Sequence, residues 1–139
     1  LDFRGKRVFD FGCGTGILAI LAAKLGAVAI DAVDIEPPSF ENTLENAKIN
    51  GVSDAVHALL GDLSVVEGSG YDIILANINR GVILDAFPTL HQKLKQGGIL
   101  LISGILKTDR DLVLAEALQH GFSPVQTLEK GNWLAVRLH

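Results

Sequence analysis

Residues 7–34 read R-V-F-D-F-G-C-G-T-G-I-L-A-I-L-A-A-K-L-G-A-V-A-I-D-A-V-D. The first five of these residues form an apolar strand that runs directly into Gly12–Gly16, and residues 17–25 follow as an apolar segment of strong helix formers. Gly26 can end that helix in the left-handed conformation. Residues 27–34 then form a second strand, whose near-continuous apolar character is typical of a parallel strand covered on both faces. The stretch predicts a β-α-β unit with a glycine turn.

The same alternation continues along the chain and ends in a hairpin. Strands are predicted at residues 7–11, 27–34, 55–60, 71–76, 99–103, 123–128 and 133–138. Helices are predicted at residues 17–25 and 39–50, along the apolar positions 83–94 with Pro88 bending the helix or delaying its start, and after a capping box formed by Thr108 and Asp111. Five β-α units followed by a hairpin, with Gly131 and Asn132 at positive φ in its turn, predict an α/β fold: a doubly wound, mostly parallel seven-stranded sheet with helices on both faces.

Composition is typical of one folded domain. The chain has 139 residues, of which 48% are hydrophobic and 20% charged, too apolar for a disordered chain. Its longest uninterrupted apolar run, residues 17–23, is far shorter than a bilayer span, and no signal-type segment opens the sequence. The single cysteine, Cys13, cannot form an internal disulfide. A cytoplasmic location without membrane contact is therefore expected.

Charge argues against a nucleic-acid substrate. The formal net charge is -4, and the twelve Lys and Arg residues are scattered along the sequence rather than gathered into a basic stripe. A mildly acidic surface would tolerate a lysine-rich protein partner, although it equally suits ordinary solubility.

The glycine turn is the expected ligand site, because open sheets of this type bind ligands beyond the carboxyl ends of their strands. A dinucleotide-binding enzyme would carry G-x-G-x-x-G, with a third glycine where Ile17 stands. The carboxylate of Asp10, at the end of the first strand, would repel a pyrophosphate at close range. The turn therefore favours a ligand that carries ammonium and sulfonium charge over NAD, although a tight turn without a ligand is the structural alternative.

The segment D-F-G-C-G-T-G at residues 10–16 resembles the D-x-G-x-G-x-G motif of class I S-adenosylmethionine-dependent methyltransferases. The resemblance implies a Rossmann-like methyltransferase fold, S-adenosyl-L-methionine as cofactor, S-adenosyl-L-homocysteine as product, and no metal. It also implies that an acidic residue accepts hydrogen bonds from both ribose hydroxyls, that a second one accepts from the adenine amino group, and that an apolar neighbour covers the ring. The implied cofactor-binding residues are Asp10, Gly12, Cys13, Gly14, Gly16, Asp34 for the ribose, Ile35, Asp62 and Leu63 for the adenine, and Asn77. The alternatives for Asp34 and Asp62 are a strand-end carboxylate and a simple Gly-Asp turn.

Asn77 is the predicted catalytic residue. The segment Asn77–Arg80 follows the fourth strand, where amino-methylating members of the superfamily carry Asn-Pro-Pro-Tyr or a relative of it. Methyl transfer from a sulfonium needs a neutral nitrogen lone pair held on axis, and an amide oxygen can hold it by accepting a hydrogen bond from the amine. The alternative is that Asn77 only caps the next helix. The histidines share no metal-ligand spacing, so no metal site is predicted.

Longer segments resemble the ribosomal protein L11 methyltransferase family: residues 12–26, 76–80, 102–106 and 132–136. This resemblance implies that lysine side chains and the N-terminal amine of a ribosomal protein, L11, are methylated. It also implies that residues 1–139 form the catalytic domain, with the family's N-terminal substrate-recruiting domain absent. Pro37-Pro38-Ser39 departs from the family pattern. The alternatives are a class I methyltransferase for a small molecule or another protein, and a non-catalytic cofactor-binding domain.

Overall fold

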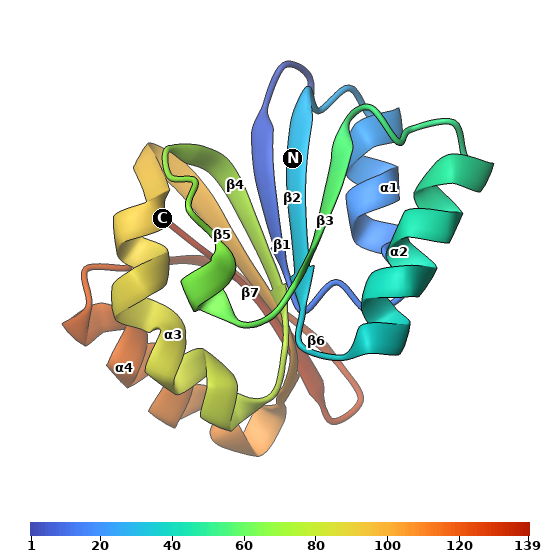
Figure 1. The fold of residues 1–139 in the computed structure, drawn as a ribbon. Helices are drawn as coiled ribbons and strands as arrows, with labels where there is room; N and C mark the ends of the chain where they lie inside the picture. The colour runs from blue at the N-terminus through green and yellow to red at the C-terminus, as the bar shows by residue number, and fades with distance from the viewer.

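The computed structural model describes all residues from 1 to 139. A single seven-stranded sheet has the order β3-β2-β1-β4-β5-β7-β6, with helices on both faces (Figure 1). The strands are β1 (Arg7–Phe11), β2 (Ala29–Asp34), β3 (Val56–Leu60), β4 (Tyr71–Asn77), β5 (Leu94–Leu106), β6 (Pro124–Lys130) and β7 (Trp133–Leu138). The helices are α1 (Ile17–Lys24), α2 (Pro37–Ile49), α3 (Arg80–Lys93) and α4 (Arg110–Gln119), with 3-10 turns η1 (Leu63–Val65) and η2 (Lys107–Asp109).

The sheet confirms the predicted fold class. Strands β1 to β5 are parallel to one another, whereas β7 pairs antiparallel with both β5 and β6. From β1 the chain moves outward through β2 to β3, and it then crosses back to place β4 on the other side of β1. The strand order therefore reverses between β1 and β4, which is where open sheets of this kind form a ligand crevice.

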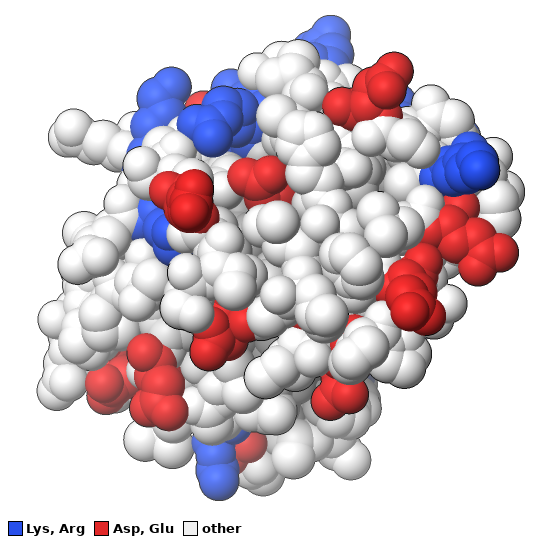
Figure 2. Space-filling model, in the orientation of Figure 1, with Lys and Arg blue, Asp and Glu red and all other residues white.

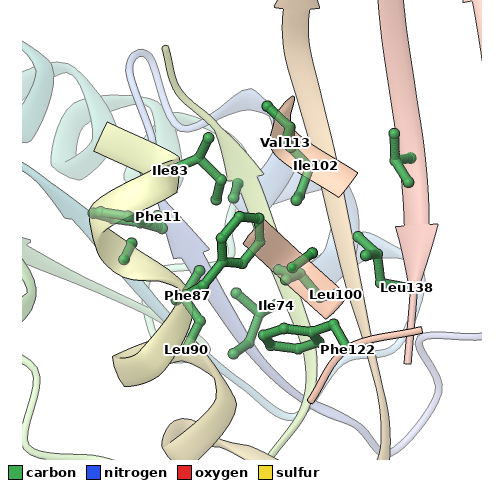
Figure 3. Packing of buried hydrophobic residues seen from close by; sticks show 14 of the residues in the cluster. Phe11, Ile74, Ile83, Phe87, Leu90, Leu100, Ile102, Val113, Phe122 and Leu138 are labelled. Atoms are coloured by element: carbon green, nitrogen blue, oxygen red, sulfur yellow. The ribbon is translucent and has the colours of Figure 1, made fainter. Parts of the chain in front are cut away.

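Two apolar layers explain why the strands are apolar on both faces. Helices α1 and α2 cover one face of the sheet, and α3 and α4 cover the other (Figure 1). The larger cluster has 20 buried residues and lies between the sheet and α3 and α4, where Phe87 and Phe122 pack with ring centroids 5.8 Å apart (Figure 3). The smaller cluster has 12 and lies beneath α1 and α2. No helix combines the length and apolar character that a membrane span requires.

The segment between β3 and β4 departs from the prediction of five β-α units. Residues 61–70 contain only the short turn η1, because Gly61, Gly68 and Gly70 favour turns over helix. The ammonium of Lys93 fixes this segment to α3 by donating to the carbonyls of Val66 at 2.6 Å and Gly68 at 3.0 Å.

Five local details also differ. Helix α2 begins at Pro37 rather than residue 39, since proline fits a first helical turn. Pro88 lies inside α3 without delaying its start.

The glycines at 97–98 do not precede β5 but lie within it, near a register shift against β4. The predicted capping box is wrong, because Asp109 takes the N-cap position of α4 and no side chain caps it. In the hairpin turn Gly131 has the predicted positive φ, 60°, but the prediction is wrong for Asn132, because only glycines have a positive φ in this chain.

Candidate functional site

A cavity of about 620 Å³ opens at the carboxyl ends of β1, β2, β3 and β4. It lies where the strand order reverses, so four strands that are distant in sequence contribute to it. Here it is called the ligand cavity. Its lining residues are Phe11, Gly12, Gly14, Val33, Asp34, Ile35, Gly61, Asp62, Asn77, Ile78, Asn79 and Val82.

Six of the predicted site residues line this cavity, and four do not. The lining residues among the predicted set are Gly12, Gly14, Asp34, Ile35, Asp62 and Asn77. Those outside the lining are Asp10, Cys13, Gly16 and Leu63. Asp10 is instead buried, Cys13 and Gly16 face Thr43 on α2, and Leu63 packs against the larger core cluster.

Asp34 is held by backbone amides on both of its carboxylate oxygens. Its Oδ2 accepts a hydrogen bond from the amide of Gly14 at 2.9 Å, and its Oδ1 accepts one from the amide of Glu36 at 3.0 Å. The carboxylate thereby ties the end of β2 to the glycine turn. Because a carboxylate oxygen can accept more than one hydrogen bond, both oxygens can still receive donors from a diol in the ligand cavity.

The segment Gly12–Gly16, here called the glycine loop, offers bare backbone to the cavity. A Cβ at Gly12 would lie only 2.6 Å from Cγ2 of Ile78 and 3.3 Å from the carbonyl oxygen of Asn77, so only glycine allows the ends of β1 and β4 to approach. The amides of Gly12 and Cys13 both donate to the carbonyl of Val33, at 2.9 and 3.0 Å. These two amides are therefore used within the fold.

Asp10 is a buried carboxylate beneath the glycine loop. Its residue is only 1% exposed, and neither side-chain oxygen has a hydrogen-bond partner of normal geometry. Burial raises the pKa of Asp10 from 3.8 to about 7; the amide of Ala19 opposes the rise and the charge of Asp34 adds to it. A buried acid with a raised pKa and no partner is costly for the fold and is typical of functional sites.

Cys13 and Gly16 face helix α2 rather than the cavity. The Sγ atom of Cys13 lies 3.3 Å from Oγ1 of Thr43, and burial raises the pKa of the thiol to about 11, so the group stays protonated at neutral pH. A Cβ at Gly16 would lie 2.9 Å from Cγ2 of Thr43. Leu63 packs against the larger core cluster. The cofactor contacts of Cys13, Gly16 and Leu63 remain predictions.

Asp62 combines a local structural role with a place in the cavity wall. As the N-cap of η1, its Oδ1 accepts hydrogen bonds from the hydroxyl of Ser64 at 2.5 Å and from the amide of Ser64 at 2.8 Å. These bonds lower the pKa of Asp62, so the side chain is ionised and can accept from an amino group.

Asn77 does not cap helix α3, so that alternative is wrong. The cap is Asn79, whose side-chain oxygen accepts from the amide of Val82 at 3.0 Å. Asn77 ends β4 opposite Ser103 of β5, and its exposed side chain borders the cavity. A Cβ at Gly104 would lie 2.5 Å from Oδ1 of Asn77.

A sequence profile of the family described as "Ribosomal protein L11 methyltransferase" matches residues 1–139. The chain belongs to this family. It is 42% identical over 138 residues to the ribosomal protein L11 methyltransferase of Porphyromonas gingivalis, a match that covers 99% of the chain and 47% of that protein. The chain spans about half the length of the curated family members it matches.

Solved structures agree with this membership. A ribosomal protein L11 methylase from Lactobacillus delbrueckii subsp. bulgaricus superposes with a TM-score of 0.93 at 32% identity, covering 98% of this chain and 70% of that one. An RNA methyltransferase from Salinibacter ruber, solved with S-adenosyl-L-homocysteine, superposes with a TM-score of 0.77 at 21% identity, covering 95% of this chain and 78% of that one. The second likeness concerns the fold alone.

Three residues that contact the site were not among the residues predicted from the sequence. Thr43 and Asn46 on α2 contact the glycine loop from behind, and Gly104 on β5 makes room for Asn77. Two features of the sequence could have pointed to them. Thr43 and Asn46 are three residues apart and so share one side of a helix, and Gly104 lies inside a strongly apolar strand. No group of three or more His, Cys, Asp or Glu side chains is arranged to hold a metal ion.

Proposed function

We propose that this chain is the catalytic domain of an S-adenosyl-L-methionine-dependent protein methyltransferase. In this proposal it transfers methyl groups to lysine side chains and the N-terminal amine of ribosomal protein L11, in the cytoplasm. The observation that carries the proposal is the single cavity shared by the glycine loop, Asp34, Asp62 and Asn77.

The residues present fit the cofactor. Glycines at 12 and 14 leave backbone-lined space, and Asp34 holds two carboxylate oxygens ready for the two ribose hydroxyls. Asp62 can accept from the adenine amino group. The unpartnered carboxylate of Asp10 beneath the loop suits a ligand with ammonium and sulfonium charge, although it does not line the cavity.

When bound, S-adenosyl-L-methionine supplies an electrophilic methyl group on a sulfonium that is already a good leaving group. The protein's task is then to orient a neutral amine. The side-chain oxygen of Asn77 accepts a hydrogen bond from that amine and directs its lone pair into the cavity. Nearby positive charge and exclusion of water both favour the deprotonated form of a lysine.

Surface charge supports an amine-bearing substrate. In Figure 2 several acidic side chains and few basic ones lie along the lower edge, which is the edge where the parallel strands end in Figure 1. A lysine-rich protein segment would be attracted to this edge, whereas a polyphosphate backbone would be repelled. No direct contact with nucleic acid or membrane is part of the proposal.

The test is to incubate the chain with isotopically labelled S-adenosyl-L-methionine and ribosomal protein L11, and to locate methyl groups by mass spectrometry. Ribosomal proteins of similar lysine content serve as the control. Label on lysines and the N-terminal amine of L11 alone is expected. Label on a different protein or a small molecule would overturn the substrate, and cofactor binding without any transfer, both by this chain and by the full-length protein, would indicate a non-catalytic domain.

A further inference from the structure

Two polar side chains of α2, one turn apart, contact every residue from Cys13 to Gly16. Thr43 is completely buried, and Asn46 is half-buried three residues later on the same side of the helix. Neither residue lines the ligand cavity. They lie behind the glycine loop.

Thr43 contacts three residues of the loop. Its hydroxyl donates to the carbonyl of Gly14 at 3.1 Å, which leaves the hydroxyl oxygen free to accept from the thiol of Cys13 at 3.3 Å. Its methyl group fills the space that a side chain at Gly16 would need, since a Cβ there would lie 2.9 Å from Cγ2. The hydroxyl therefore fixes the hydrogen bonding of the loop, whereas the methyl group only restricts position 16 to glycine.

Asn46 holds the remaining residue. Its side-chain amide donates to the carbonyl of Thr15 at 2.9 Å. Each peptide group is planar, so fixing the carbonyls of Gly14 and Thr15 also fixes the direction of the following amides. Asp34 restrains the other side of the loop through the amide of Gly14, so that both polar groups of this residue are occupied.

The loop needs such restraint because of its composition. Gly12, Gly14 and Gly16 have φ values of 77°, 57° and 83°, and glycine loses more conformational freedom on ordering than any other residue. A loop that is not held would lose that freedom when the ligand binds, and the affinity would fall.

We propose that Thr43 and Asn46 are positioning residues that hold the glycine loop in its ligand-binding conformation without touching the ligand. The inference rests on the proposed function for the identity of the ligand, S-adenosyl-L-methionine. Cofactor affinity is then determined partly by side chains of α2 outside the cavity.

The test uses variants that separate the hydroxyl from the shape of the side chain. Thr43→Val keeps the shape and removes the hydroxyl, whereas Thr43→Ser keeps the hydroxyl. Asn46→Ala removes the second contact, and Asn50→Ala is the matched control because the Asn50 amide bonds only to the backbone of Asn46 within α2. Calorimetry with S-adenosyl-L-homocysteine measures affinity, thermal melting measures stability, and hydrogen exchange reports on the loop amides.

Thr43→Val should bind S-adenosyl-L-homocysteine about ten-fold more weakly, the scale of leaving a buried carbonyl without a donor. Asn46→Ala should also bind more weakly, while Thr43→Ser and Asn50→Ala should stay within about three-fold of the wild type. Loop amides should exchange faster in Thr43→Val than in Thr43→Ser.

Unchanged affinity in Thr43→Val, or equal weakening in Thr43→Val and Thr43→Ser, would overturn the inference. If the wild-type chain bound no adenosyl ligand, the proposed function would fail, yet the exchange comparison would still decide the positioning role. Equal exchange of the loop in the Val and Ser variants would then count against it.

Discussion

The side-chain oxygen of Asn77 lies 2.5 Å from the position that a Cβ would occupy at Gly104. Gly104 has φ 78° and lies where the pairing of β5 with β7 shifts register between Ile102 and Ile105. The glycine and the irregular pairing leave room for the amide at the end of β4. The orientation of the proposed catalytic side chain thus depends on a residue in the neighbouring strand.

Asn77→Ala should separate chemistry from binding. In its proposed role the amide orients the amine, so its loss should reduce methyl transfer to L11 by a factor on the order of a hundred or more, because misplacing the nucleophile forfeits much of the proximity advantage. The affinity for S-adenosyl-L-homocysteine should stay within a few fold. Single-turnover methylation and calorimetry measure the two quantities.

Two further variants control this prediction. Gly104→Ala should reduce turnover in the same way, because the added Cβ would displace the Asn77 amide. Asn77→Asp should show activity only at raised pH, because a carboxylate holds the amine as ammonium. Normal turnover with selectively lost cofactor binding in Asn77→Ala would move the residue from methyl transfer to cofactor binding.

Asp34→Ala should weaken the binding of S-adenosyl-L-homocysteine by about 1.5–3 kcal/mol, the scale of hydrogen bonds to a charged group. The variant loses the proposed acceptor for the ribose and also the hydrogen bond from the amide of Gly14. Glu36→Ala is a suitable control, since Glu36 bonds to Asp34 through its backbone amide, which the substitution keeps. An unchanged affinity in a folded Asp34→Ala variant would show that Asp34 does not hold the ribose.

The strand ends could be read from the sequence because their signals are local. The predicted positions of Asp34 and Asn77 follow from apolar strands that stop at a polar residue, and both side chains line the cavity. The glycine turn likewise follows directly from residues 7–26. Long-range contacts could not be read in this way. Thr43 and Gly104 meet the site only after α2 and β5 have packed against it, and nothing in their local sequence specifies that partner.

The absence of a helix between β3 and β4 has a different cause. Predicting a helix in every gap follows the α/β alternation, but residues 61–70 have too many glycines to form one. The capping box failed because Thr108 and Asp111 match the pattern while the chain turns through η2 instead. Local patterns thus predicted the strands of the sheet, whereas the conformations of the two connecting segments η1 and η2 became clear only from the structure.

Asp10 should make stability depend on pH. Its pKa is raised from 3.8 in the unfolded chain to about 7 in the folded one, so the folded state binds more protons between these values. The contribution of Asp10 to stability is therefore complete below about pH 4 and is lost as pH rises through 7. One pKa unit corresponds to about 1.4 kcal/mol. The free energy of unfolding of Asp10→Asn, compared with that of the wild type, should therefore be higher at pH 8 than at pH 4 by up to a few kcal/mol.

Urea denaturation of both proteins at pH 4 and pH 8 measures this difference, and the comparison cancels the titration of other groups. If the variant and the wild type differed in stability by the same amount at pH 4 and at pH 8, Asp10 would ionise normally.

Tyr71→Phe should lower the free energy of unfolding by about 1.5–3 kcal/mol. The hydroxyl of Tyr71 donates to Oδ2 of Asp31 at 2.5 Å, which explains the one acidic residue inside the otherwise apolar strand β2. Neither residue lines the ligand cavity, so the affinity for S-adenosyl-L-homocysteine should not change. Urea denaturation provides the measurement. A variant as stable as the wild type would mean that this hydrogen bond contributes no net stability.

The proposed ligand of the cavity beside the glycine loop is an adenosyl cofactor rather than a dinucleotide. Calorimetric titration of the chain with S-adenosyl-L-homocysteine and, separately, with NAD tests it most directly. We expect one site for S-adenosyl-L-homocysteine, with weaker binding in Asp34→Ala, and no heat of binding for NAD, because Ile17 replaces the third glycine and Asp10 lies beneath the loop. Binding of NAD with no binding of the adenosyl ligand would contradict it.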